Sequence, residues 1–434
     1  MGFRKLTVRF AGLAAAALLA AGTLVGCVNA SDVKAEEPAS VSSTASAANV
    51  STISMGTATD SSTGAISAAS TAADTNTELT SSRVSVTIDG KSTTLSGAYV
   101  VDGIDAVIDG GTYSSTTADQ AVFLVVNGGR LTITNARIAK AGDATSSGQH
   151  GVDDSYSFYG LNSAVVVVGQ GSSVTVSETT LTTDASGANA VVATGSANAT
   201  VTSCAIATTG ESSRGLHATY AGVITGSDLT IETQGAHCAA LATDRGSGTV
   251  AVDGTNTFTT NGDGSPCLYS TGQITVSGLT GQANASQAVV VEGKNHVTVT
   301  DSTLVTASQT GGVMLYQSMS GDAADADATT EVSTLAMTGV SLTCTHKVPI
   351  LYVTNTSSQA TLTRCALEAP GGLATADEDR WGTAGSNGGV LALTMDVTAS
   401  DGAITAGSES SSITVVTANG GTATGPISGN VTVS

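Results

Sequence analysis

Apolar residues recur in this chain at a nearly constant interval, and that interval is the strongest constraint on its fold. Leu181, Ile206, Ile231 and Phe258 follow one another at spacings of 25, 25 and 27 residues. A fixed period between about 20 and 50 residues is typical of a solenoid, in which each repeat forms one coil stacked on the next. The same column continues forwards and backwards through Leu279, Leu304, Leu342, Leu367, Ile138 and Tyr113.

Each repeat contains short segments typical of β-strands. Segments 190–194, 215–219, 239–243 and 267–271 align, with small or apolar residues at alternate positions. Thr and Val, which favour strands, are frequent in the repeats, and no stretch after residue 30 has apolar residues at helical spacing. A lone coil cannot bury enough apolar surface to offset its loss of backbone entropy, whereas stacked coils share one core. The sequence therefore predicts an all-β stack of about 10–12 coils.

These repeats resemble the right-handed, single-stranded parallel β-helix of the pectin-lyase-like superfamily. The resemblance rests on repeat length, on Thr, Val, Ser and Gly content and on the stacked apolar columns, and it covers about three quarters of the chain. It implies the fold but no particular activity, because this fold serves many functions. An aromatic content of only 3% fits such a thin stacked core.

The first 27 residues resemble a bacterial lipoprotein signal. Arg4, Lys5 and Arg9 precede an apolar run, residues 11–24, that is too short to span a membrane comfortably. Positions 24–27 read Leu-Val-Gly-Cys, which resembles a lipobox and implies that Cys27 is lipidated; the alternative is an ordinary secretory signal. We expect residues 1–26 to be a removed signal peptide. The lipid alone would then anchor the protein outside the cytoplasm, exposed on the surface of the bacterial cell membrane.

Two further regions precede the repeats. Residues 27–82 are rich in Ser, Thr and Ala with almost no large apolar residues, so they should form a disordered tether. Val84, Val86 and Ile88 then alternate with polar residues. This alternation predicts a strand that caps the N-terminal end of the β-helix domain, residues 83–434, because an open coil edge would pair with other chains.

Charge and cysteine content narrow the possible partners. The formal net charge of −20 repels nucleic acids and acidic polysaccharides, so we expect no nucleic-acid partner. After Cys27 five cysteines remain, an odd number that cannot all pair within one chain. Cys238 and Cys267 lie one aligned position apart in neighbouring coils, on opposite strand faces. We interpret them as small core residues, with a disulfide as the alternative in an oxidising compartment.

Three segments interrupt the period, namely residues 142–162, 318–330 and 376–389. Insertions in a solenoid often form its binding side. The second contains Asp322, Asp325 and Asp327, whose oxygens could bind Ca²⁺, the one cofactor that the sequence suggests. The alternative is a solvated acidic turn, because the glycine and the terminal glutamate of an EF-hand loop are missing.

One strand of each coil should carry an apolar stripe on its outer side. If Leu216 points inward, His217 points outward. We align His217 with Val166, Val192, Leu241, Tyr269, Val290, Leu315 and Leu351. Loops folded over the stripe, a ligand or partner surface, and a mistaken register are the three explanations. A threonine lattice, as in some ice-binding β-helices, would need more than the one threonine per strand counted here.

The first insertion contains the best candidates for acid–base chemistry. His150 stands near Asp153 and Asp154, and polygalacturonase-like enzymes of this fold use clustered aspartates as acid and base. The basic segment and separate histidine motif of those enzymes are missing, as are the basic residues that the lyases place over calcium. We therefore transfer no catalytic residue from either. The alternative is that these three residues cap turns of the loop.

Aromatic residues provide candidates for binding. Tyr156 and Tyr159 lie in the first insertion, and Tyr269 lies on the stripe. Arg380 and Trp381 lie in the third insertion. An aromatic face suits the apolar face of a sugar ring, although a lone tryptophan more often packs under its own loop.

A polar site is also conceivable on adjacent coils. Arg214 and His217 precede Tyr220 in one coil, and Asp244 and Arg245 follow in the next. Because the charges are of both signs, a salt-linked surface is the alternative.

The whole chain resembles the adhesin-like β-helix lipoproteins of bacterial surfaces. We expect a non-catalytic adhesin or glycan-binding protein, whose ligand is a glycan or another surface protein. The alternative is a polysaccharide lyase or glycoside hydrolase of the pectin-lyase-like fold. Insertions that converge on one strand face would favour a true site, and scattered insertions would favour a scaffold.

Overall fold

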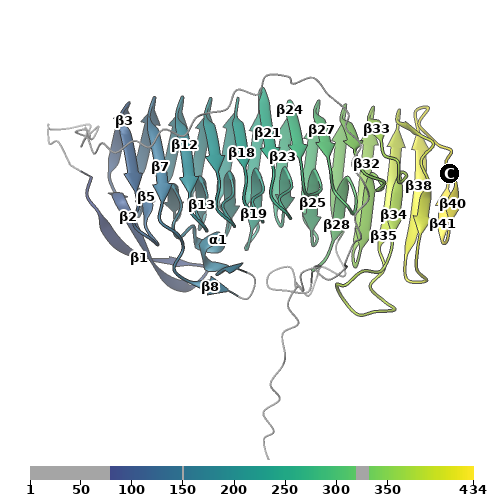
Figure 1. Cartoon of the computed structure of the whole chain (residues 1–434), viewed down its shortest axis with the longest axis horizontal. Helices are drawn as coiled ribbons and strands as arrows, with labels where there is room; N and C mark the ends of the chain where they lie inside the picture. Colours follow the sequence, from purple (N-terminus) through teal and green to yellow (C-terminus); the bar gives the residue numbers. More distant parts are fainter. Residues whose placement is uncertain (1–78, 149–150, 319–331) are drawn as a thin grey trace, which may run out of the picture. The chain divides into compact units, whose positions relative to one another are not determined.

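The computed structural model describes residues 79–148, 151–318 and 332–434, which form a parallel β-solenoid of about 13 turns with 1% helix. Equivalent strands of successive turns pair in parallel, so three long sheets run along the stack (Figure 1). The all-β stacked fold predicted from the repeat is confirmed. The turns outnumber the expected 10–12, in part because the last ones are short: the strands at Val390 and Ser412 start only 22 residues apart.

The 14-stranded sheet carries the candidate site on its outer face. Its order is β1 (Ser82–Ile88), β2 (Lys91–Asp102), β5 (Ala121–Val126), β10 (Val165–Val168), β13 (Val191–Thr194), β16 (Leu216–Thr219), β19 (Leu241–Asp244), β22 (Leu268–Ser270), β25 (Val289–Glu292), β28 (Val313–Tyr316), β31 (Leu351–Thr354), β34 (Ala374–Ala376), β37 (Ile404–Ala406) and β40 (Ile427–Ser428).

The 13-stranded sheet forms a second face. Its order is β3 (Asp105–Asp109), β6 (Arg130–Thr134), β11 (Ser173–Ser177), β14 (Asn198–Thr202), β17 (Val223–Ser227), β20 (Thr249–Asp253), β23 (Gln273–Ser277), β26 (His296–Thr300), β29 (Ser333–Thr338), β32 (Ser357–Thr363), β35 (Val390–Asp396), β38 (Ser412–Ala418) and β41 (Val431–Val433).

The 10-stranded sheet forms the third face. Its order is β33 (Ala366–Glu368), β30 (Ser341–Cys344), β27 (Thr303–Thr306), β24 (Leu279–Ala283), β21 (Asn256–Thr260), β18 (Thr230–Thr233), β15 (Ala205–Thr208), β12 (Thr180–Asp184), β7 (Arg137–Ala141) and β4 (Thr112–Ser115). The remaining elements are helix α1 (Ser155–Tyr159) and two small pairs, β8 (Ser147–Gly148) with β9 (Gly151–Val152) and β36 (Ala399–Ser400) with β39 (Thr422–Ala423).

The apolar column that predicted the fold is a true stack. Leu181, Ile206, Ile231 and Phe258 pair in register on β12, β15, β18 and β21 and belong to one buried core. The continuation through Leu279 is wrong, because the residue in register with Phe258 is Gly281. A Cβ at this glycine would lie 2.7 Å from a methyl carbon of Leu304, so the core has less space for a side chain at this position of the column.

Part of the expected outward stripe is wrong by one residue. Leu241, Leu315 and Leu351 point into the core, and the outward residues on β19, β28 and β31 are Ala242, Met314 and Tyr352. A slip of one residue exchanges the two faces of a strand. The slip arose because segment 239–243 was aligned one residue early: Leu216 pairs with Leu241, which places Ala240 beside Gly215.

The N-terminal strand is half of a hairpin. β1 pairs antiparallel with the first part of β2, and the second part of β2 pairs with β5. Ile88 and Leu95 of the hairpin pack with Leu124, Val166 and Val168 on the outer face of the 14-stranded sheet. The hairpin therefore covers a face, whereas a strand across the end of the stack was expected.

Aromatic rings fill the N-terminal turns of the core. Tyr99 lies 5.4 Å from Tyr113 and 5.3 Å from Phe123 between ring centroids. Tyr113 and Phe123 are buried core residues, and Tyr99 packs against the core. Such ring pairs stabilise beyond the area that they bury.

The outer face of the 13-stranded sheet is regular. Its first outward column from β6 to β26 contains Thr132, Thr175, Thr200, Thr225, Ala251, Thr275 and Thr298. The next outward column contains Thr134, Ser177, Thr202, Ser227, Asp253, Ser277 and Thr300. The count of one threonine per strand is therefore wrong for this sheet, whose exposed strand positions favour threonine.

All five cysteines among the described residues are free thiols. Cys238 and Cys267 are fully buried, as expected of small core residues. They are two aligned positions apart: the Cys238 amide donates to Ser265 Oγ in the next turn, and Cys267 follows two residues later. Cys365 is the one partly exposed thiol among them.

Several predictions fall outside the described residues. These are the signal peptide, Cys27 and nearly all of the tether, His150, and the acidic residues Asp322, Asp325 and Asp327. Within the described ranges, no helix has both the length and the apolar character needed to cross a membrane.

Candidate functional site

Two insertions cover the 14-stranded sheet on the same side of the solenoid (Figure 1). The first includes β8, β9 and α1 and precedes β10; the third follows β34. The first insertion contacts strands β13, β16 and β19, and the third contacts β28 and β31. Strands β22 and β25 lie between the two contact regions. The described parts of the insertions therefore flank one stretch of one sheet face.

The first insertion is anchored at its base by buried polar groups. The Tyr156 hydroxyl donates to Asp119 Oδ1 and accepts from the amides of Thr145 and Ser146 at 3.0 and 3.1 Å. Lys140 is only 1% exposed, and its ammonium donates to three backbone carbonyls, among them those of residues 117 and 142 at 3.1 and 2.9 Å. Burial lowers the pKa of Lys140 to about 8. Tyr156 is thus a buried structural contact of the insertion, and a role in binding stays an untested prediction.

Helix α1 lies on the apolar part of the sheet. It ends at Gly160, whose φ is 69°, and a Cβ there would lie 2.9 Å from Val192. Thr219 Oγ1 donates to the carbonyl of Phe158 at 2.8 Å, and the Tyr159 ring stacks on Tyr220 at 5.7 Å. Of the three explanations for the stripe, coverage by a loop therefore holds for this half of the sheet.

His217 points outward from β16 but is fully buried. Among the described residues, neither of its ring nitrogens has a hydrogen-bond partner of good geometry, although the backbone of Ser157 lies close enough to act on its pKa. Burial and the nearby Arg214 guanidinium hold the pKa of His217 well below its usual 6.5. The ring is therefore a neutral part of the α1 docking surface, and the prediction of a binding role for His217 is not supported by its burial.

Arg214 connects α1 with Asp244, which lies at the edge of the covered region. Its guanidinium donates to Ser157 Oγ and lies 3.8 Å from Asp244 Oδ2, with the side chain only 12% exposed. Arg245 lies over the Phe158 ring at 4.2 Å, and its amide donates to Asp244 Oδ1. Burial, opposed by Arg214, raises the pKa of Asp244, and Glu292 contributes to the rise. Arg214 and Asp244 form an ion pair, as in the salt-linked alternative, and a binding role for this cluster stays a prediction.

Glu292 lies on β25, between the strands that the described parts of the two insertions contact. It is 4% exposed, and its Oε2 accepts hydrogen bonds from the hydroxyls of Tyr269 and, at 2.7 Å, of Tyr316. Burial and then the Glu292 charge raise the pKa of Tyr269 well above 10. Tyr269 therefore stays a protonated donor at neutral pH.

The third insertion adds Trp381 to this cluster. Its ring lies 4.8 Å from that of Tyr316, tilted by 53°, and the Arg380 guanidinium lies 4.5 Å above it. Asp379 of the same insertion accepts from the Tyr352 hydroxyl at 2.8 Å. We call Tyr269, Glu292, Tyr316 and Trp381 the aromatic–acid row. All three of its aromatic residues are partly exposed.

The acid–base candidates of the first insertion do not join this row. Asp153 Oδ1 accepts from the amide of Ser155 at 2.9 Å, which lowers the Asp153 pKa and fits the turn-capping interpretation. Asp154 is the exposed N-cap residue of α1 and makes no side-chain cap bond. Both lie in the insertion beside β16, whereas Trp381 packs beside β28.

Sequence analysis found three members of the site and missed three. Tyr269, Trp381 and Asp244 were candidates; Tyr269 donates to Glu292, and Trp381 packs against Tyr316, which donates to the same carboxylate oxygen. Glu292, Tyr316 and Tyr352 were missed as site residues. The signal was present, because Glu292 and Tyr316 occupy the column in which β13 and β16 have Thr194 and Thr219.

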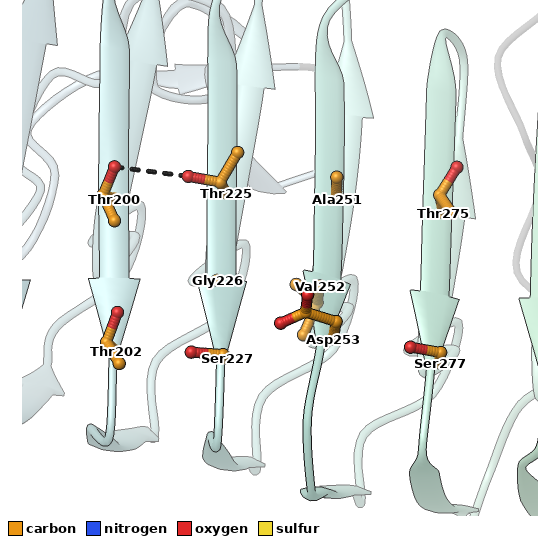
Figure 2. Close-up of a pocket in the computed structure, with 10 residues that line it drawn as sticks. All are labelled: Thr200, Thr202, Thr225, Gly226, Ser227, Ala251, Val252, Asp253, Thr275 and Ser277. Atoms are coloured by element: carbon orange, nitrogen blue, oxygen red, sulfur yellow. Dashed lines mark hydrogen bonds between the residues drawn. The ribbon is translucent and has the colours of Figure 1, made fainter.

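A separate hollow lies on the outer face of the 13-stranded sheet. The hollow spans β14, β17, β20 and β23 with a volume of about 380 Å³, and within it Thr225 and Thr275 stand on either side of Ala251 (Figure 2). Thr200 and Thr225 bond each other through their hydroxyls at 3.2 Å. The lining contains no aromatic residue.

Comparison with known proteins does not extend these observations. No family model matches the chain, and no curated protein is significantly similar to it.

Proposed function

We propose that the protein is a non-catalytic, lipid-anchored adhesin of the bacterial cell surface that binds a glycan at the aromatic–acid row. The observation that carries the proposal is that two tyrosine hydroxyls meet at the buried Glu292 carboxylate, with Trp381 packed on the ring of one of these tyrosines. Partly exposed aromatic rings suit the apolar faces of sugars, and a carboxylate with fixed donors suits their hydroxyls. The finer fold assignment, a right-handed β-helix of the pectin-lyase-like superfamily, belongs to the same proposal.

The test is a glycan array on the full chain, with the Trp381→Ala variant beside it. We expect at least one glycan class to bind and the variant to lose most of that binding, because a stacked aromatic residue contributes about 1 kcal/mol or more. Binding that is unchanged in the variant would exclude the row as the site. Absence of binding to any glycan would exclude the function.

A second candidate is glycan hydrolysis. Asp244 has a raised pKa, as a general acid requires, and Glu292 is close enough to contribute to that shift. A mixture of neutral oligosaccharides incubated with the full chain would show shortened products by mass spectrometry. Products that disappear in Asp244→Asn would replace the adhesin by an enzyme, whereas binding without turnover would exclude the enzyme.

The lipid anchor is proposed from the sequence around Cys27 and rests on no structural observation. Metabolic labelling with a fatty-acid analogue tests it directly. Label should enter the wild type and be absent from Cys27→Ala, which should also leave the membrane fraction. A labelled Cys27→Ala variant would contradict the anchor.

A further inference from the structure

The charge of Glu292 has no cationic partner in the described part of the chain. Three ion pairs occur there, Arg130–Asp105, Arg214–Asp244 and His237–Glu211, and none includes Glu292. Carboxylates that are almost fully buried are rarely left without a cation, because desolvation penalises an isolated charge. Two tyrosine hydroxyls compensate it only in part, since they supply dipoles and no charge.

The surroundings favour a positive ligand group over a negative one. The Glu292 charge contributes to the raised pKa of Asp244, so this edge of the sheet is acidic. Arg214 is held between Ser157 and Asp244, and Arg380 lies over the Trp381 ring. The formal net charge of −20 adds a long-range attraction for cations.

The aromatic rings give the cation a second reason to bind at this position. The hydroxyls of Tyr269 and Tyr316 meet at the same carboxylate oxygen, and Trp381 packs against Tyr316. The face of an aromatic ring attracts a cation through its quadrupole. A buried carboxylate bonded to two tyrosines, one of which packs on a tryptophan, is a combination that suits an ammonium group.

We propose that the aromatic–acid row binds the protonated amine of an amino sugar, so that the ligand is a glycan with free amino groups. This inference rests on the proposed glycan-binding function and specifies its ligand class. Glu292 would neutralise the ammonium group, and the exposed ring surfaces of the row would contact the sugar.

Two matched oligosaccharides test the inference by calorimetry, an oligomer of glucosamine and the same oligomer of N-acetylglucosamine. They differ in the amine, which only the first can protonate. We expect the full chain to bind the glucosamine oligomer at least about ten-fold more tightly. In Glu292→Gln, which keeps the shape and removes the charge, the two affinities should agree to within about two-fold.

A control separates the site from general attraction between a polycation and an acidic protein. Asp253→Asn removes one exposed carboxylate from the outer face of the 13-stranded sheet and changes the net charge equally. It should leave the preference unchanged. Equal loss in both variants, or equal binding of both oligomers by the wild type, would overturn the inference. Absence of binding to any glycan, acetylated or free, would overturn the proposed function itself.

Discussion

The outer faces of two sheets in the same solenoid differ sharply. On the 13-stranded sheet two outward columns from β6 to β26 contain threonine or serine at every position except Ala251 and Asp253, and these residues are at least partly exposed. On the 14-stranded sheet the equivalent residues run from valine to histidine, aspartate, tyrosine and glutamate, and several are fully buried. Both faces belong to the same turns, so the repeat itself cannot explain the difference.

The comparison distinguishes structural features that follow from the repeat from features that do not. A regular Thr/Ser face follows from strand propensity and from hydroxyl bonds between neighbouring turns, such as Thr200 with Thr225. Among the described residues, a buried histidine without a well-aligned hydrogen-bond partner, a buried glutamate without a cation and two folded insertions do not follow from it. We therefore assign function to the irregular face, and each prediction below compares it with the regular one.

The largest effect on stability is expected from comparing a covered valine with an exposed one. Val192 is fully buried beneath the first insertion, whereas Val107 on β3 is 40% exposed. Val192→Asp buries an unpaired charge and should lower the free energy of unfolding by about 3 kcal/mol or more. Val107→Asp should change it by no more than about 0.5 kcal/mol. Urea unfolding followed by circular dichroism measures both, and equal losses would show that the insertion does not seal this face.

A pH effect should arise from the covered face alone. Because the pKa of His217 is held well below 6.5 in the folded protein, both states carry a neutral imidazole above that pH. Below it only the unfolded state gains a proton, so the free energy of unfolding should fall by up to about 1.4 kcal/mol per pH unit. His217→Leu should remove this dependence between pH 7 and pH 5, as measured by thermal unfolding.

The matching control lies on the regular face. His296 is exposed on β26, with Nδ1 2.8 Å from the Thr334 hydroxyl. His296→Gln should keep the pH dependence of the wild type. A profile that His296→Gln flattens and His217→Leu does not would show that α1 docking is insensitive to protonation of the buried ring.

The sequence was sufficient for the fold because a solenoid repeats its signal. Leu181, Ile206 and Ile231 each mark the same inward position, so one accidental match cannot create the column. Errors came where a turn differs from its neighbours in length or in side chains. At Leu241 the alignment was shifted by one residue, which exchanges the two faces of the strand, and at Gly281 no side chain marks the column. The repeat also could not reveal that the N-terminal strand folds back over a face.

The site was less predictable because the residue types in its columns do not repeat from turn to turn. Trp381 and Tyr269 were found as conspicuous aromatic residues, but their meeting point required three dimensions. Tyr316 is 24 residues from Glu292 in the sequence. Its hydroxyl and that of Tyr269 both donate to Glu292 Oε2 only because β22, β25 and β28 lie side by side. His217 was assigned an exposed role because nothing local indicates that α1 covers it.

The smallest effect should come from single hydroxyl groups, and it gives the sharpest comparison of the two faces. Tyr316→Phe removes one of the two donors to the buried Glu292 and should cost about 1 kcal/mol of stability. Thr225→Val removes a hydroxyl whose partner Thr200 is also exposed, so water replaces the bond and the change should stay below about 0.5 kcal/mol. Thermal unfolding of both variants in the same buffer measures the difference. A Thr225→Val loss as large as that of Tyr316→Phe would mean that the hydroxyl columns also stabilise the stack, and the regular face would then need a structural explanation beyond strand propensity.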